Sequence, residues 1–197
     1  MTIPDHDQPE QWRLNEVAEY FKLLPPPIAP RSVLDIGANV GLFTQEARRR
    51  WPNAQFYACE PHPANCAEFR RRCPWATLYS VAVGDCSGVG KLREGDQDVV
   101  HSLKRTKRST GRIIPCELMD ANLLPSCSLV KIDAEGAEVE ILQRLDHSMT
   151  IHLIYEYHSN ACRKLSMQAL KGFFTLEGEI EHDGADRMGL MYWRGGA

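Results

Sequence analysis

The amino-acid sequence predicts an α/β domain with a doubly wound, mostly parallel sheet and helices on both faces. Short apolar segments rich in β-branched residues alternate along the chain with stretches that have helical character. This alternation is typical of parallel sheets, whose strands are buried on both faces. A glycine-bearing turn at residues 37–41 follows the first apolar segment, as expected where a strand leads into a helix beside a ligand.

The first predicted element is an amphipathic helix at residues 12–24, where apolar residues recur at helical spacing from Leu14 to Leu24. Three prolines at 25–27 end it, because proline cannot continue a helix. Further helices are predicted from the glycine turn to about residue 50 and at residues 64–72, 137–145 and 166–174. Strands are predicted at residues 32–36, 55–59, 76–83, 128–132, 151–155 and 188–193.

The regular alternation is interrupted between residues 84 and 120, where glycines and charges separate short β-prone pieces. We therefore expect an irregular insert there. We interpret its basic residues as a solvated loop, with contact to an anionic substrate as the alternative; they are Lys104, Arg105, Lys107, Arg108 and Arg112. His101 and Ser102, in the same insert, are further candidates for substrate contact.

Length and composition limit the protein class. At 197 residues we expect one domain at 31–197, with a tail and the first helix at 1–30 packed on it. The 23 basic and 26 acidic side chains give a net charge of −3, which disfavours a general nucleic-acid binder. The chain has no apolar run long enough for a membrane span, and its N-terminus is polar. These two features predict a soluble, cytoplasmic protein. The seven cysteines lack a C-x-x-C pair and are expected to be free thiols.

The glycine turn reads Asp35-Ile36-Gly37-Ala38-Asn39-Val40-Gly41. Its two glycines let the backbone approach a ligand closely, and the next helix directs its N–H groups toward the same place. The spacing is G-x-x-x-G rather than the G-x-G-x-x-G of dinucleotide sites. Asp35, at the mouth of the strand, would repel a pyrophosphate but suits a cationic ligand.

A second acid, Glu60, directly follows the second predicted strand, 25 residues beyond Asp35. In such folds an acid at this place binds the ribose hydroxyls, because a carboxylate accepts from both groups of a diol. A ligand with a ribose and a cationic end fits S-adenosylmethionine.

Polar groups also follow the fourth and fifth predicted strands. Asp133 and Glu135 come at the end of the fourth strand, and Glu156 and His158 lie where the fifth strand ends. Because the carboxyl ends of parallel strands share one edge of a sheet, all four strand ends are expected to converge on one crevice.

These residues resemble the FkbM-type methyltransferases, a family of class I S-adenosylmethionine-dependent enzymes. The resemblance lies in VLDIGANVGLFT (33–44), CEPHP (59–63), VKIDAEGAEVEIL (130–142) and IYEYH (154–158). It implies a seven-stranded Rossmann-like sheet with a C-terminal antiparallel hairpin, whose strands would be residues 179–182 and 188–193.

The resemblance also implies a set of cofactor-binding residues. The methionine end of the cofactor would be surrounded by Asp35, Gly37, Asn39 and Gly41, with Ala38 between them. The ribose would be held by Glu60 and Pro61. The adenine would lie near Ser80, Val81 and the turn at Gly84 and Asp85, and the methyl group would lie beside Asp133. The product would be S-adenosylhomocysteine.

The expected reaction is O-methylation of a hydroxyl on a small molecule such as a sugar, a lipid-linked compound or a secondary metabolite. A hydroxyl nucleophile gains from a base that takes its proton, and we assign that role to Glu156 or His158, with Asp133 orienting the acceptor. No metal is required, although Asp133, Glu156 and His158 are of the right types to hold a divalent ion. A monomer or homodimer is expected.

Other functions remain open at this point. The runner-up is methylation of a nitrogen or of an RNA ribose hydroxyl, which only the basic insert supports. A nicotinamide-dependent oxidoreductase on the same sheet is disfavoured by Asp35 and by the missing middle glycine. The remaining alternative is a cofactor-binding module without activity.

Overall fold

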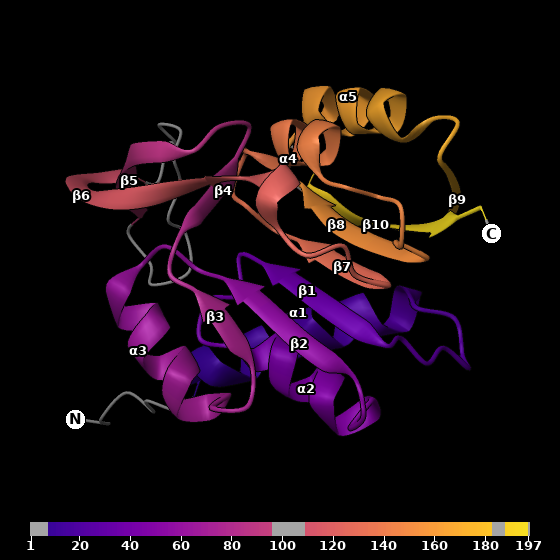
Figure 1. The fold of residues 1–197 in the computed structure, drawn as a ribbon, viewed down its shortest axis with the longest axis horizontal. Helices are drawn as coiled ribbons and strands as arrows, with labels where there is room; N and C mark the ends of the chain where they lie inside the picture. The colour runs from indigo at the N-terminus through magenta and orange to yellow at the C-terminus, as the bar shows by residue number, and fades with distance from the viewer. Residues whose placement is uncertain (1–7, 96–108, 183–187, 197) are drawn as a thin grey trace.

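The computed structural model describes residues 8–95, 109–182 and 188–196, and it is built around a seven-stranded sheet (Figure 1). The strands lie in the order β3-β2-β1-β7-β8-β10-β9. The first five are parallel, and β10 runs antiparallel to both of its neighbours. The predicted doubly wound fold with a C-terminal antiparallel hairpin is therefore confirmed. The bounds are β1 (Ser32–Ile36), β2 (Gln55–Cys59), β3 (Thr77–Tyr79), β7 (Leu129–Ile132), β8 (His152–Tyr157), β9 (Phe174–Glu181) and β10 (Gly189–Gly195).

Helices cover both faces of this sheet, with α1, α2 and α3 on one side and α4 and α5 on the other (Figure 1). Their bounds are α1 (Gln8–Leu23), α2 (Leu42–Arg50), α3 (Pro63–Arg72), α4 (Glu138–Arg144) and α5 (Asn160–Leu170). All four residues of β7 are buried, because this central strand has a helical layer on each side.

Helix α1 packs by its aromatic residues on the same face as α2. The ring of Phe21 stacks on Phe43 at 5.0 Å between centroids, and Tyr20 meets Phe43 edge-on at 5.7 Å. Both side chains belong to one buried cluster with residues of β1, β2 and β10. Helix α1 thus covers one face of the sheet, and it also directs residues such as Tyr20 toward the carboxyl edge of the strands.

The predicted third strand at 76–83 is wrong as a single element. The chain leaves the main sheet after β3, passes the exposed Ser80 and continues as β4 (Ala82–Gly84) in a second sheet. There Ala82 packs with Leu92 and Cys116. An apolar run does not reveal such a change of sheet, because both halves of the run form strand, the first half-buried and the second buried.

The prediction of an irregular insert at 84–120 is also wrong. β4 pairs with β6 (Ser109–Asp120), and β6 pairs antiparallel with β5 (Gly88–Gly95). A Cβ at Gly90 would lie 2.7 Å from the Leu118 side chain, so a glycine here allows close packing rather than breaking the strand. The 3-10 turn Ala121–Leu123 then leads toward β7. The candidate contacts His101, Ser102, Lys104, Arg105, Lys107 and Arg108 lie outside the described residues.

Two boundaries near the C-terminus differ from the prediction. Helix α5 begins six residues earlier than the predicted helix at 166–174, because the Ser159 side chain caps it by accepting from the Cys162 N–H. Phe174 is the first residue of β9, which is longer than the predicted strand at 179–182. All seven cysteines are free, as expected. Among the described helices, none is long and apolar enough to cross a membrane.

Candidate active site

The glycine turn after β1 packs directly on the backbone at the end of β7. Gly37 has a φ of +75°, and a Cβ on it would lie 1.7 Å from the carbonyl oxygen of Asp133. The Asp133 N–H donates to the carbonyl of Ile36 at 3.0 Å, and the Lys131 ammonium donates to the carbonyl of Gly37 at 2.8 Å. Glycine is required here because any side chain would separate the two strand ends.

A cavity opens beside this contact, with the carboxylate of Glu60 on its wall. The N–H groups of Asn39 and His62 each donate to one oxygen of this carboxylate, at 2.9 and 2.8 Å. Glu60 is 5% exposed, and burial raises the pKa of its carboxyl group. Oε1 also accepts a long hydrogen bond from the Asn65 amide at 3.4 Å, whereas Oε2 keeps a lone pair, so an oriented carboxylate is available to a diol.

The predicted cofactor-binding residues divide into two groups. Six of them line the cavity: Gly37, Asn39, Glu60, Pro61, Val81 and Asp133. Four do not line it: Asp35, Ala38, Gly41 and Ser80. Ala38 is buried against α3, Gly41 starts α2 with a φ of +91°, and Ser80 is exposed and accepts from Arg70. Further lining residues that the sequence did not single out include Asn65, Leu92 and Ala134.

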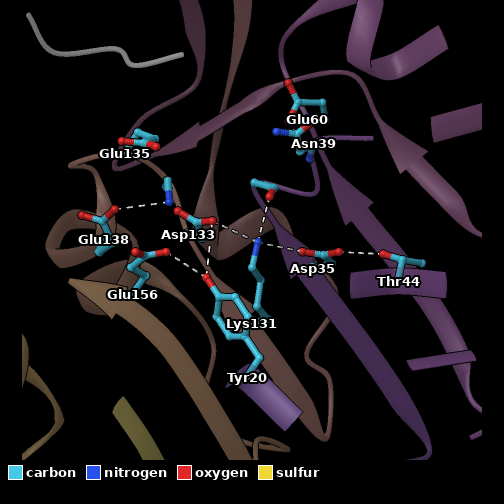
Figure 2. A network of polar contacts seen from close by, with 12 residues as sticks. Tyr20, Asp35, Asn39, Thr44, Glu60, Lys131, Asp133, Glu135, Glu138 and Glu156 are labelled. Carbon is cyan, nitrogen blue, oxygen red and sulfur yellow. Dashed lines mark hydrogen bonds and ion pairs between the residues drawn. The ribbon is translucent and has the colours of Figure 1, made fainter. Parts of the chain in front are cut away.

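Asp35 lies beneath the turn rather than in the cavity, and it is fully buried. Its carboxylate accepts from the Thr44 hydroxyl at 2.6 Å and pairs with the Lys131 ammonium at 3.2 Å. Lys131 also lies 3.5 Å from the carboxylate of Asp133 (Figure 2). Nearby carboxylates, Asp35 first, raise the pKa of Lys131 above its usual value despite burial. Sequence analysis missed Lys131, although a lysine inside an apolar strand is a signal of a paired buried charge.

Two of the predicted catalytic residues, Asp133 and Glu156, meet at the hydroxyl of a tyrosine from α1. The Tyr20 hydroxyl lies 3.0 Å from Oε2 of Glu156 and 3.4 Å from Oδ2 of Asp133 (Figure 2). Glu16, one helical turn earlier on α1, brings a carboxylate to the same place. Burial and the charge of Asp133 raise the pKa of Glu156 to about 8 and that of Glu16 to about 7. The carboxyl groups of Glu16 and Glu156 therefore gain or lose a proton near neutral pH.

His158 approaches Asp133 from the side opposite Lys131. Its Nδ1 lies 3.1 Å from Oε1 of Glu138, and its Nε2 lies 3.9 Å from Asp133 and 3.5 Å from Glu135. The backbone N–H groups of Ala134 and Gly136 hold the buried Glu138 carboxylate in place. The Glu138 carboxylate raises the pKa of His158 well above its usual value, against the opposing effect of burial.

Comparison with known proteins agrees with this geometry. A model of the methyltransferase FkbM domain matches residues 35–169, which is more than half of the chain. The chain belongs to this family. Its cofactor is therefore S-adenosylmethionine. The cavity beside Gly37 and the carboxylate of Glu60, which can accept from a ribose diol, fit that molecule.

Two curated relatives share parts of the sequence. A "Methyltransferase 1" from the fungus Beauveria bassiana is 24% identical over 147 residues, which are 58% of this chain and 58% of the relative. A malonyl-[acyl-carrier protein] O-methyltransferase from Halorhodospira halophila is 41% identical over 62 residues, 30% of this chain and 21% of the relative. The chain thus matches less than two thirds of either relative.

Solved structures share the fold at low sequence identity. Precorrin-6y C5,15-methyltransferase from Geobacter metallireducens aligns with a TM-score of 0.55 at 13% identity, over 92% of this chain and 87% of that one. The N-methyltransferase NodS from Bradyrhizobium japonicum, in complex with S-adenosyl-L-homocysteine, aligns with a TM-score of 0.55 at 12% identity, over 98% and 93%. Similarity at this level shows the fold alone.

Proposed function

We propose that this protein transfers a methyl group from S-adenosylmethionine to a hydroxyl oxygen of a small molecule. The observation that carries the proposal is that Asp133, on the wall of the cavity that Glu60 lines, shares the Tyr20 hydroxyl with Glu156, which is buried behind it and does not itself line the cavity. S-adenosylmethionine, when bound, supplies a methyl group that its sulfonium charge has already activated. The protein then has to bind, orient and deprotonate the acceptor.

Glu60 is the residue that would hold the ribose, because two backbone N–H groups already fix its orientation. Gly37 and Asn39 would leave room for the methionine end, since both line the cavity and Gly37 has no side chain. Asp35, Ala38 and Gly41 would act from beneath, by shaping the turn that carries these two residues. Ser80 and Val81 precede β4, and only Val81 lines the cavity where the adenine would bind.

Glu156 is the proposed base for the acceptor hydroxyl. Its Oε2 is engaged with Tyr20, which leaves Oε1 to accept a proton from an acceptor. Asp133, on the wall of the cavity and 20% exposed, would orient the acceptor by accepting a hydrogen bond. His158 would act through Asp133 and Glu135, because Glu138 holds one of its nitrogens.

Oxygen is preferred to nitrogen as the acceptor atom because the site offers carboxylates rather than an aromatic or amide cage. A neutral amine needs less help from a base than a hydroxyl, so an acidic cluster of this size has more use with a hydroxyl. The local similarity to an O-methyltransferase agrees with this preference. Membership of a methyltransferase family disfavours the nicotinamide-dependent oxidoreductase.

The first test is thermal unfolding with S-adenosylmethionine, S-adenosylhomocysteine or NAD added separately. A ligand that binds only the folded protein raises the unfolding midpoint. We expect a shift with the two sulfur compounds and none with NAD. A shift with NAD alone would contradict the assigned cofactor.

The second test follows tritiated methyl transfer to a panel of hydroxylated and amine acceptors. Glu156→Gln should lower turnover by about 100-fold or more, as for loss of a general base, and should keep the unfolding shift given by S-adenosylhomocysteine. Glu117→Gln, which removes an exposed acid on β6, is the matched control and should keep full turnover. Label found only on amines, or full turnover in Glu156→Gln, would reject the proposal.

A further inference from the structure

The ring nitrogen Nε2 of His158 faces two carboxylates across a gap that no hydrogen bond spans. It lies 3.5 Å from Oε2 of Glu135 and 3.9 Å from Oδ1 of Asp133. Both distances exceed those of a good hydrogen bond, which are about 2.7–3.2 Å. One ligand atom from each of the three residues lies within 4.8 Å of the other two.

This spacing fits a metal ion between the three atoms. Two ligand atoms that each lie about 2.1 Å from an ion are about 3.0 Å apart at a right angle and about 4.2 Å apart in line. The observed 3.5 and 3.9 Å fall between these limits. The two distances from His158 are therefore compatible with an ion between these atoms, and the two carboxylate atoms lie within 4.8 Å of each other.

A second observation is independent of the acids that line the gap. His158 is oriented from behind by Glu138, which is fully buried and lies 3.1 Å from Nδ1. Glu138 is itself held by the N–H groups of Ala134 and Gly136, at 3.2 and 2.8 Å. This contact is an ion pair rather than an aligned hydrogen bond, and the negative charge of Glu138 favours a proton on Nδ1, which leaves Nε2 as the nitrogen that can bind a metal.

The balance of charge points the same way. The carboxylates of Glu16, Asp133 and Glu156 form a second group around Asp133, and Lys131 is the one lysine that the structure pairs with this residue. Lys131 also serves Asp35. A cation bound beside Asp133 would offset part of the negative charge of these carboxylates.

We propose that Asp133, Glu135 and His158 bind a divalent metal ion of the Mn²⁺ or Mg²⁺ class at the rim of the cavity. Two carboxylate oxygens and one imidazole nitrogen are suitable ligands for such an ion. Three protein ligands leave positions open, and the site borders the cavity through Asp133 and Glu135. These positions would take water or oxygen atoms of an acceptor. The proposal concerns binding to the protein alone and stands apart from the identity of the acceptor.

The test is a titration of the full chain with Mn²⁺, without cofactor or acceptor, followed by the electron paramagnetic resonance signal of free Mn²⁺. We expect one saturable site in the unaltered protein. Glu135→Gln and His158→Gln should each weaken binding by about tenfold or more. Glu117→Gln, with the same loss of charge at an exposed position, should change it less than about twofold.

Three results would overturn the proposal. One is the absence of saturable binding to the unaltered protein. Another is binding by Glu135→Gln and by His158→Gln that is as tight as binding by the unaltered protein. The third is binding that survives in these two variants and is lost in Glu16→Gln, which would assign the ion to the group on α1 and β8 instead.

A nuclear magnetic resonance spectrum of the imidazole nitrogens gives an independent readout. The proposal predicts that Nε2 of His158 loses its proton and shifts when diamagnetic Zn²⁺ or Mg²⁺ is added, while Nδ1 keeps its proton toward Glu138. An imidazole that stays doubly protonated at saturating metal would mean that the proton itself balances the acids, and the proposal would be wrong.

Discussion

The acids at the carboxyl edge of the sheet differ from the acids at the ends of α2 and α3. Glu46 and Glu68 each accept hydrogen bonds from the two arginines that follow them on the same helix, which lower the pKa of both carboxyl groups to about 2. At the sheet edge, burial raises the pKa of Glu16 and Glu135 to about 7 and that of Glu156 to about 8. Within this domain, the surroundings of glutamate carboxyl groups thus shift their pKa values in opposite directions.

The acids on α2 and α3 support the fold, whereas the acids at the sheet edge are better explained by a functional role. Exposed pairs at helix ends contribute little each but contain no strain. Two arginines in the last turn of each helix pair with these acids: Arg49 and Arg50 with Glu46, and Arg71 and Arg72 with Glu68. Buried carboxylates that repel one another weaken the folded state, and such clusters gather at functional sites. The predictions below test this separation in order of decreasing effect.

Gly37→Ala should produce the largest change, because it forces the two strand ends at the acidic edge apart. The new Cβ would overlap the Asp133 carbonyl oxygen, and the φ of +75° is itself unfavourable for alanine. We expect a loss of about 4 kcal/mol or more in the free energy of unfolding, measured by urea denaturation. Gly196→Ala, where a Cβ meets no atom within 4 Å, should cost less than about 0.5 kcal/mol. Similar losses for both would show that the close approach is unimportant.

Lys131→Met should destabilise the protein by about 3–5 kcal/mol, because it leaves Asp35 and Asp133 without their buried partner. Arg49→Met removes a partner of Glu46 from a position where the arginine side chain is 70% exposed. That change should cost much less in the same urea experiment, because water screens an exposed ion pair. Equal costs for the two variants would remove the distinction between the two regions.

Stability should depend on pH with opposite signs in the two regions. Glu16, Glu135 and Glu156 have raised pKa values, so their favourable contribution is complete below the unfolded pKa of 4.5 and is lost as pH rises through about 7–8. The raised pKa of His158 acts in the same direction, and the lowered pKa of His152 opposes it. We expect the ligand-free protein to lose about 1 kcal/mol or more between about pH 5 and 8, measured by urea denaturation. Glu156→Gln should reduce that slope, and an unchanged slope would contradict the assignment.

Glu46→Gln should give the smallest effect, about 0.3–1 kcal/mol at pH 7, because its salt bridges are open to water. The pKa of Glu46 is lowered, so its contribution is present above pH 4.5 and disappears as pH falls toward about 2. In thermal unfolding, the variant should therefore differ most from the unaltered protein near neutral pH, and the difference should shrink steadily as pH falls below 4.5. A larger difference at acid pH would reverse the sign assigned here.

The sequence by itself determined the parts of the protein that depend on local pattern. Strands β1 and β2 lie at the predicted residues. The acids of KIDAEGAE follow β7, and the acid of IYEYH is the last but one residue of β8, at the same sheet edge. Burial on both faces leaves continuous apolar runs, and the carboxyl ends of parallel strands always share an edge. Fold class and the neighbourhood of the site follow from these two facts.

The tertiary structure alone decided which side chains meet. Tyr20 and Glu156 are 136 positions apart in the chain, and Lys131 reaches back to the carbonyl of Gly37 across 94 positions. The second sheet likewise depends on the pairing of β4 with β6, which an apolar run at 76–83 does not specify. Local patterns record whether a residue is buried, whereas the partner of a buried charge is set by packing between distant segments.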